Sequence, residues 1–251
     1  MDLGLAGKNV VVTGGSKGIG KQIALGFARE GAHVAICARN EGPLRETEAE
    51  IRRENVTGYA ATCDIGNAAG LDAFLDEARR QLGGVDIFVH NPSALAFTDD
   101  PVGWETSVNI DLMAGVRAIW KVLPWMIDSG GGCLLFISSV TGLEAGWPPA
   151  YAAAKAALIS YAKTLSVSLA PQRIRVNTLT PGSIEFAGGV WAMVKESNRA
   201  LYDTVLGTIP WGRLGTPEEV ADVAVFLCSQ RANWVTGACL SVDGGQHRSN
   251  L

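Results

Sequence analysis

Charged residues, histidines and paired cysteines are scarce in this 251-residue chain. Only 18% of it is charged, with a formal net charge of −4, so it presents no basic field to attract nucleic acid or an anionic membrane surface. The three histidines, His33, His90 and His247, show no ligand spacing, which argues against a metal site. Five cysteines, an odd number without a Cys-x-x-Cys pair, favour reduced, buried thiols and a cytoplasmic location over a disulfide framework.

Long apolar runs and linkers are also missing. The longest apolar stretches, such as Cys133–Ile137, are far below the ~20 residues that span a bilayer, so no membrane association is expected. No low-complexity tract, repeat or Pro/Ser-rich segment divides the chain, and 47% of it is hydrophobic, which excludes disorder. We therefore expect one domain over residues 1–251.

Short β-branched runs alternate with helical patterns along the whole chain, which is typical of a parallel sheet with helices on both faces. Thr216-Pro217-Glu218-Glu219, for example, predicts a capping box at the start of a helix. The pattern predicts a doubly wound, seven-stranded parallel α/β sheet. The expected strands are Asn9–Thr13, His33–Ala38, Gly58–Cys63, Val85–Val89, Cys133–Ser138, Ile174–Leu179 and Ala238–Val242.

A glycine-rich turn, Thr13-Gly14-Gly15-Ser16-Lys17-Gly18-Ile19-Gly20, follows the first expected strand and opens a helix. Its glycines are spaced more widely than in G-x-G-x-x-G. The position between strand and helix is nevertheless the context in which backbone N–H groups and a positive helix end bind a pyrophosphate. The sequence thus predicts a Rossmann-type dinucleotide site.

The end of the second strand bears on the choice of nucleotide. An NAD site usually has an acidic residue there, whereas an arginine accommodates the 2′-phosphate of NADP. This chain has Ala38 followed by Arg39, with Lys17 in the glycine turn, so NADPH is favoured over NADH. Asp64, after the third strand, is expected either to bind the adenine edge or to cap the next helix.

Tyr151 and Lys155 are four residues apart in an alanine-rich stretch, 150–170, that should be helical, so both side chains share one face. A positive charge about 5 Å from a phenol contributes roughly 3 kcal/mol at an effective dielectric of ~20, or about two pKa units. Lys155 could therefore bring the pKa of Tyr151 towards working pH.

Several further motifs accompany this pair in the same chain. They are Ser138-Ser139 after the fifth strand, Asn109 in an expected long helix over Trp104–Ile127, Val176-Asn177-Thr178-Leu179-Thr180-Pro181-Gly182 and Val242-Asp243-Gly244-Gly245. With the nucleotide turn, they resemble the short-chain dehydrogenase/reductase family in the right order over essentially the whole chain. The resemblance is to single-domain members of the 3-oxoacyl reductase kind.

The resemblance implies roles for individual residues. Tyr151 looks like the proton donor or acceptor, and Lys155 would bind the nicotinamide ribose and lower the tyrosine pKa. Ser139 would hydrogen-bond the substrate oxygen, because Ser139-Val140-Thr141-Gly142 matches the family's Ser-x-x-Gly, although Ser138 remains a rival. Asn109 would anchor a backbone bend and a water. The residues expected to contact the cofactor are Gly14, Ser16, Lys17, Gly18, Ile19, Gly20, Arg39, Asp64, Asn91, Tyr151, Lys155, Pro181, Gly182 and Ile184.

Two positions depart from the family pattern. His90-Asn91-Pro92-Ser93 replaces Asn-Asn-Ala-Gly, and we interpret His90 as a packed substitute for the first asparagine rather than an additional acid or base. Phe186 stands where a threonine often meets the nicotinamide carboxamide, so that hydrogen bond should be lost. Residues from about 183 to 211 match the family's variable lid. Trp147, Phe186 and Trp191 are expected at the substrate, which suggests an apolar or bulky carbonyl compound.

The resulting hypothesis is an NADPH-dependent oxidoreductase acting on a ketone, a 3-oxoacyl compound or the corresponding secondary alcohol. The alternatives are an NAD-dependent dehydrogenase of a secondary alcohol, sugar or steroid, and a non-catalytic nucleotide-binding regulator. The segment Pro124–Cys133 contains no Lys or Arg, which disfavours substrates on acyl carrier protein. The resemblance also implies a homotetramer or homodimer formed through the Trp104–Ile127 helix and the helix of Tyr151.

Overall fold

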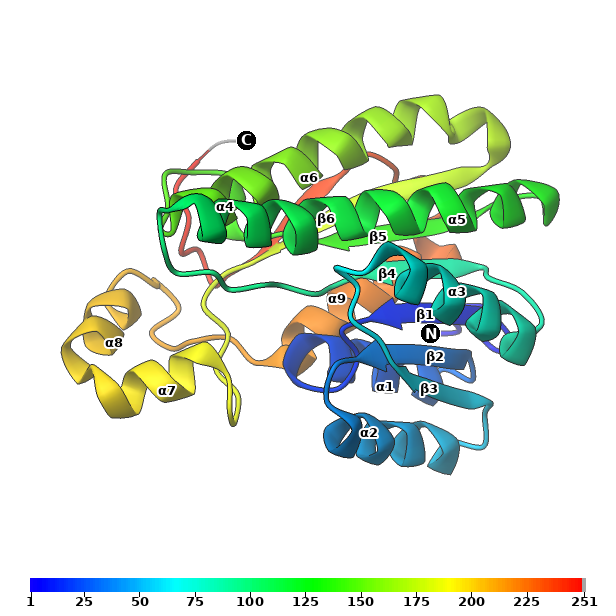
Figure 1. Cartoon of the computed structure of the whole chain (residues 1–251), viewed down its shortest axis with the longest axis horizontal. Coiled ribbons are helices and arrows are strands. Elements are labelled where there is room, and N and C mark those ends of the chain that lie inside the picture. Colours follow the sequence, from blue (N-terminus) through cyan, green and yellow to red (C-terminus); the bar gives the residue numbers. More distant parts are fainter. Residues whose placement is uncertain (250–251) are drawn as a thin grey trace.

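The computed structural model describes residues 1–249 and contains a seven-stranded, wholly parallel sheet in the order β3-β2-β1-β4-β5-β6-β7 (Figure 1). Near-continuous apolar runs form these strands because both faces of the sheet are covered. This confirms the predicted fold class. The strands are β1 (Asn9–Thr13), β2 (His33–Ala38), β3 (Gly58–Thr62), β4 (Ile87–His90), β5 (Gly132–Ile137), β6 (Ile174–Pro181) and β7 (Cys239–Val242).

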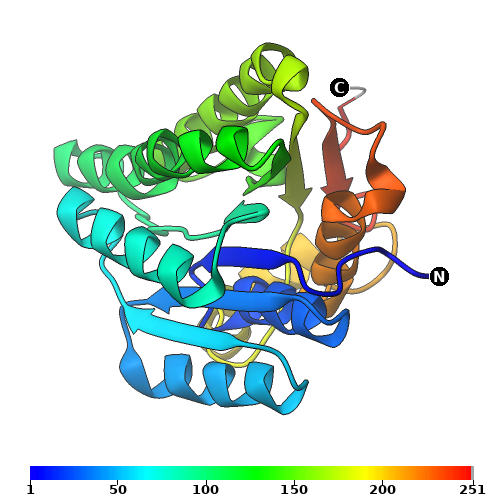
Figure 2. The ribbon, with the colours of Figure 1, turned by 90° about the vertical axis from the view of Figure 1, so that its right-hand side faces the viewer.

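Two apolar cores lie on opposite faces of the sheet (Figure 2). The helices on one face are α1 (Gly18–Arg29), α2 (Glu41–Arg53) and α9 (Pro217–Cys228). On the other face lie α3 (Ala68–Leu82), α5 (Ala114–Asp128) and α6 (Pro149–Ser168). The predicted capping box is confirmed at the start of α9, where Thr216 accepts from the amide of Glu219 and the Glu219 carboxylate accepts from the amide of Thr216.

The expected long helix over Trp104–Ile127 is not uniform. It consists of α4 (Pro101–Ser107), a π-helical segment over Val108–Met113, and α5. Apolar spacing carries no signal for the wider π turn, and such turns are frequent at functional sites. The turn changes which side chains of this helix face α6.

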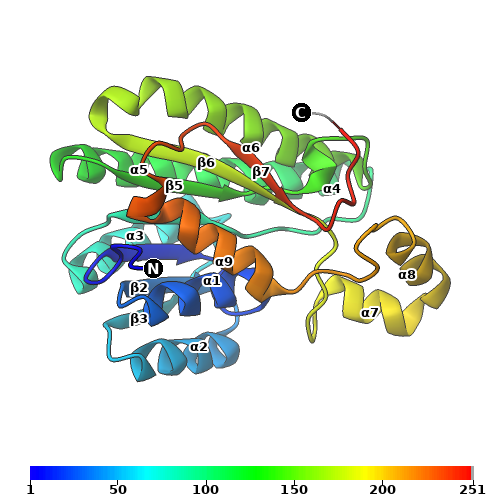
Figure 3. The ribbon, with the colours of Figure 1, turned by 180° about the vertical axis from the view of Figure 1, so that it is seen from behind.

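The bounds of β1 and β2 are those expected from the sequence, and the other five strands differ from the expected bounds by one or two residues at one end or both. Two short helices, α7 (Val190–Ser197) and α8 (Arg199–Leu206), project beyond the carboxyl ends of the strands (Figures 1 and 3). They have a small core of their own around Tyr202, Ile209 and Leu214. Within residues 1–249, no helix combines the length and apolar character needed to cross a membrane.

Candidate active site

A cavity of about 540 Å³ opens at the carboxyl ends of the strands, where a doubly wound sheet binds its ligands. It runs from the glycine turn past the end of β2 to α6 and the base of α7. Most residues expected to bind a cofactor line it: Gly14, Ser16, Lys17, Ile19, Arg39, Asp64, Asn91, Tyr151, Lys155, Pro181, Gly182 and Ile184. Gly18 and Gly20 lie just behind this surface, in the first turn of α1.

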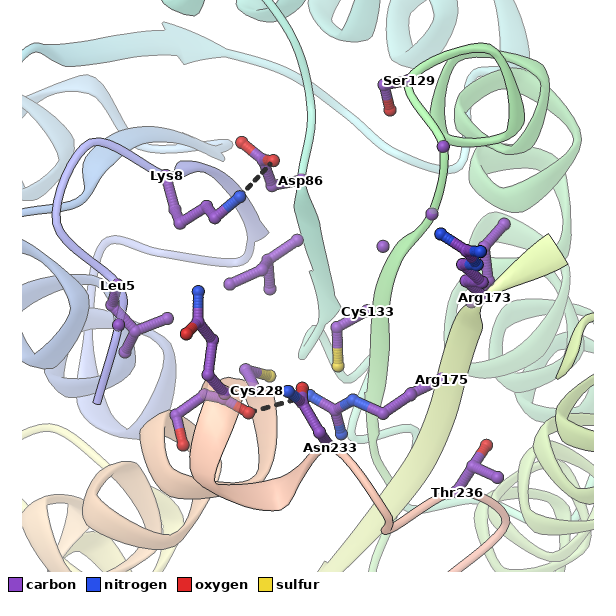
Figure 4. Close-up of a pocket in the computed structure, with 18 of the residues that line it drawn as sticks. Leu5, Lys8, Asp86, Ser129, Cys133, Arg173, Arg175, Cys228, Asn233 and Thr236 are labelled. Carbon is purple, nitrogen blue, oxygen red and sulfur yellow. Dashed lines mark hydrogen bonds and ion pairs between the residues drawn. The ribbon is translucent and has the colours of Figure 1, made fainter. Parts of the chain in front are cut away.

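A larger cavity, of about 990 Å³, lies at the opposite end of the sheet (Figure 4). There Lys8 ion-pairs with Asp86 at 3.1 Å, and Arg175 donates to the carbonyl oxygens of Leu227, Val235 and Ser229. Its charged groups are thus largely bound to the protein itself. None of the site residues expected from the sequence lines it.

The glycine turn forms an anion-binding cradle. Gly14 has a φ of 73° and Gly18 a φ of 52°, a left-handed conformation that favours glycine. Among the described residues, no side chain caps the first turn of α1, so its N–H groups and the positive end of the helix dipole remain available to an anion. The cradle fits a dinucleotide pyrophosphate.

The end of β2 places Arg39 and Lys17 together on the wall of the cleft, and both are exposed. Ala38 occupies the position at which a carboxylate would bind ribose hydroxyls. Asp64 accepts from the amide of Gly66 at 3.0 Å, whereas Asn67 caps α3 by accepting from Gly70. Of the two expectations for Asp64, helix capping is therefore wrong, and its side chain lies at the cleft.

Tyr151 and Lys155 lie on one face of α6, with the Lys155 Nζ 5.6 Å from the centre of the tyrosine ring. The Ser139 hydroxyl lies near enough to the Tyr151 phenol to lower its pKa, and it accepts from the Thr141 hydroxyl at 3.0 Å. The Ser138 hydroxyl instead donates to the backbone carbonyl of Lys155 at 2.8 Å. Between the two serines, the geometry therefore favours Ser139 as the partner of a substrate oxygen.

The expected lowering of the Tyr151 pKa is absent. Burial raises the pKa of Tyr151 to about 12, and the negative charge of Asp111 adds to the increase, while hydrogen bonds from Ser139 and Ser93 oppose it. A lowered pKa would require Lys155 to act as an uncompensated positive charge. In the structure, the Lys155 Nζ lies 3.4 Å from Asp111 Oδ1.

The side chain of Asn109 forms its hydrogen bonds outside this group. Its side-chain Nδ2 donates to the carbonyl of Gly66, and its Oδ1 accepts from Arg117 at 2.7 Å. The backbone bend is present, because Asn109 lies in the π-helical segment. The residue from this segment that reaches Lys155 is Asp111, which the sequence analysis missed. Its signal was an acidic residue directly between the apolar residues Ile110 and Leu112.

His90 is fully buried at the end of β4, and its Nδ1 lies 3.4 Å from the hydroxyl of Thr13. Burial, followed by the charge of Lys155, lowers the pKa of His90 to about 3, so the ring is neutral at working pH. This supports the interpretation of His90 as a packed residue. The adjacent Asn91 Nδ2 donates to the carbonyl of Gly14 at 3.1 Å, and Pro92 offers its carbonyl to Lys155.

The three aromatic residues expected at the substrate have different positions. Trp191 and Phe186 line the cleft, and the Phe186 ring lies against Gly18 in the phosphate turn. Trp147 is 66% exposed and, unlike the other two, does not line the cleft. Among residues 1–249, no group of three or more His, Cys, Asp or Glu side chains could hold a metal ion.

Comparison with known proteins places this site in a family. Residues 14–247 match the family model described as Enoyl-(Acyl carrier protein) reductase. The chain is 33% identical to human Dehydrogenase/reductase SDR family member 4, over 96% of this chain and 88% of that protein. It is 34% identical to the 3-oxoacyl-[acyl-carrier-protein] reductase of Chlamydia trachomatis, over 96% of this chain and 98% of that protein.

A solved structure shows the same architecture. The L-sorbose reductase of Gluconobacter frateurii, complexed with NADPH and L-sorbose, superposes with a TM-score of 0.91 at 32% identity, over 99% of this chain and 100% of that chain. The match therefore includes the sheet, the glycine turn and the lid. The chain belongs to the short-chain dehydrogenase/reductase family and is an NAD(P)-dependent oxidoreductase that interconverts alcohols and carbonyl compounds.

Proposed function

We propose that this enzyme is an NADPH-dependent carbonyl reductase. The observation that carries the proposal is the wall at the end of β2, where Arg39 and Lys17 line the cleft and Ala38 replaces a carboxylate. Two cations can bind a 2′-phosphate through charge-assisted hydrogen bonds, whereas a site for NADH has an acidic residue that accepts from the ribose hydroxyls.

The proposed reaction uses Tyr151 as the general acid. A bound nicotinamide supplies the hydride to the carbonyl carbon. The Tyr151 phenol donates its proton to the developing alkoxide, and the Ser139 hydroxyl hydrogen-bonds the same oxygen. Burial raises the pKa of Tyr151, so the phenol is protonated at neutral pH and can act as a general acid. Lys155 would hold the nicotinamide ribose.

The substrate end of the cleft combines this polar pair with apolar walls. Leu95, Phe186, Val190 and Trp191 line it beside Ser139 and Tyr151. Apolar surfaces of this kind favour a bulky or apolar ketone, or a 3-oxoacyl compound, and the polar pair orients the carbonyl group. A secondary alcohol, sugar or steroid oxidised with NAD is the alternative substrate class.

Replacing Arg39 with alanine tests the cofactor assignment. Loss of one or two charge-assisted hydrogen bonds to the 2′-phosphate should weaken NADPH binding roughly 10- to 100-fold and leave NADH binding nearly unchanged. Fluorescence titration with both nucleotides measures this. Arg53→Ala, at the far end of α2, is the matched control. Tighter binding of NADH than NADPH by the unmodified protein would contradict the proposal.

We also propose that the chain acts in the cytoplasm as a homotetramer or homodimer. Large apolar side chains are exposed on α4, α5 and the end of α6, namely Trp104, Trp120, Ile127 and Val167. A second copy could cover such a surface. Sedimentation velocity should give a mass two or four times 26.4 kDa, and a monomer at micromolar concentration would contradict this assembly. All five cysteines are free, which fits a reducing compartment.

A further inference from the structure

Lys155 is one half of a buried ion pair. Its Nζ lies 3.4 Å from Asp111 Oδ1, and the exposed fractions of the two side chains are 2% and 0%. The same ammonium donates to the carbonyl oxygens of Pro92 at 3.3 Å and Ile137 at 3.2 Å. The amide of Ala94 donates to the same Asp111 oxygen at 3.2 Å. The arrangement therefore holds both charged groups in place.

The carboxylate of Asp111 comes from the π-helical segment that packs against α6. Its second oxygen, Oδ2, has no hydrogen-bond partner among the described residues. Burying a charged group with an unsatisfied oxygen is unfavourable, so such a residue is poorly explained by stability alone. Asp111 differs from a neutral residue of the same size in that it places a negative charge beside Lys155.

We propose that Asp111 is a positioning residue that keeps the Tyr151 phenol protonated by neutralising the Lys155 ammonium, and so favours proton donation to a carbonyl oxygen over proton abstraction from an alcohol. The inference rests on the assignment of Tyr151 as the proton-transfer group of the proposed function.

The charges around the phenol support this role. α6 contributes the ammonium of Lys155, the π-helical segment contributes the carboxylate of Asp111, and β4 contributes His90, which is neutral. The hydroxyls of Ser93 and Ser139 carry no charge. The formal charge around the phenol is thus zero with Asp111 present and +1 without it. The Lys155 Nζ lies 5.6 Å from the centre of the Tyr151 ring. A positive charge at about this distance favours the phenolate by roughly two pH units at an effective dielectric of ~20.

The sharpest test is Asp111→Asn, which keeps the shape and removes the charge. Oxidation of an alcohol needs the phenolate as base, so its rate rises with pH through the phenol pKa. We expect this ascending limb to move about one to two pH units lower in the variant, with oxidation at a fixed neutral pH roughly tenfold faster or more. Reduction needs the protonated phenol, so its rate falls as the pH rises through the phenol pKa. This descending limb should also move to lower pH in the variant.

The control is Asp76→Asn, which removes a carboxylate from an exposed ion pair with Lys121 and should leave both profiles unchanged. An unshifted profile in an active Asp111→Asn enzyme overturns the inference while leaving the proposed function intact. Turnover retained by Tyr151→Phe contradicts the proposed function, and the inference with it.

A second measurement needs no Asp111 variant, because loss of the carboxylate could prevent folding. The ultraviolet difference between the cofactor-free unmodified protein and its Tyr151→Phe variant, followed with pH, reports ionisation of this one phenol. We expect its half-ionisation above pH 10. Half-ionisation at or below pH 10 would show that Lys155 acts as an uncompensated charge and would overturn the inference.

Discussion

Tyr151→Phe should lower kcat/KM by about 10²- to 10⁴-fold in both directions, because the variant keeps the ring and removes the hydroxyl proposed to exchange a proton with the substrate oxygen. Ser139 and Lys155 remain in place, so binding of the nucleotide should change little. Steady-state kinetics on a panel of ketones, combined with nucleotide titration, separates the loss of turnover from a loss of binding.

The matched control for this experiment is Tyr161→Phe on the same helix. Tyr161 packs edge-on against Phe136, with ring centres 5.9 Å apart, in the core on that face of the sheet. Removing its hydroxyl should leave turnover unchanged. If Tyr151→Phe retained more than a tenth of the activity, the phenol would not be the general acid, and a non-catalytic nucleotide-binding role would gain support.

Much of this architecture could be predicted from the sequence, because its signals are local. Buried parallel strands appear as apolar runs, and the glycine turn is recognisable from its place between a strand and a helix. The four-residue spacing of Tyr151 and Lys155 puts both on one face of α6. These features depend on neighbours within a few residues, and the structure has them where the sequence placed them.

The electrostatics of the site could not be predicted in the same way. Asp111 is 44 positions before Lys155, and it lies in a π-helical segment that packs against α6, so the contact between these two side chains could not be read from the sequence. The pKa of Tyr151 is raised by burial and by the negative charge of Asp111. The four-residue spacing of Tyr151 and Lys155 shows neither effect. The position of Trp147 outside the cleft lining could not be predicted either, because a loop residue has no periodicity to fix its direction.

Gly20→Ala should weaken NADPH binding by 10²-fold or more, although Gly20 does not itself line the cleft. A methyl group there would overlap the carbonyl oxygen of Gly14 and the side-chain amide of Asn91. These two groups are hydrogen-bonded to each other at 3.1 Å and hold the phosphate turn against the first turn of α1. The helix end must therefore move away from the turn, and its N–H groups would no longer converge on a phosphate.

The same overlap should cost about 1–3 kcal/mol of unfolding free energy, because neither backbone nor a hydrogen-bonded amide can yield easily in a packed region. Gly42→Ala in α2 is the control, since an added methyl meets nothing within 4 Å there and replaces a poor helix former. It should keep nucleotide affinity and raise stability slightly. Unchanged NADPH affinity in a folded Gly20→Ala protein would mean that the turn and α1 do not bind the phosphates as a unit.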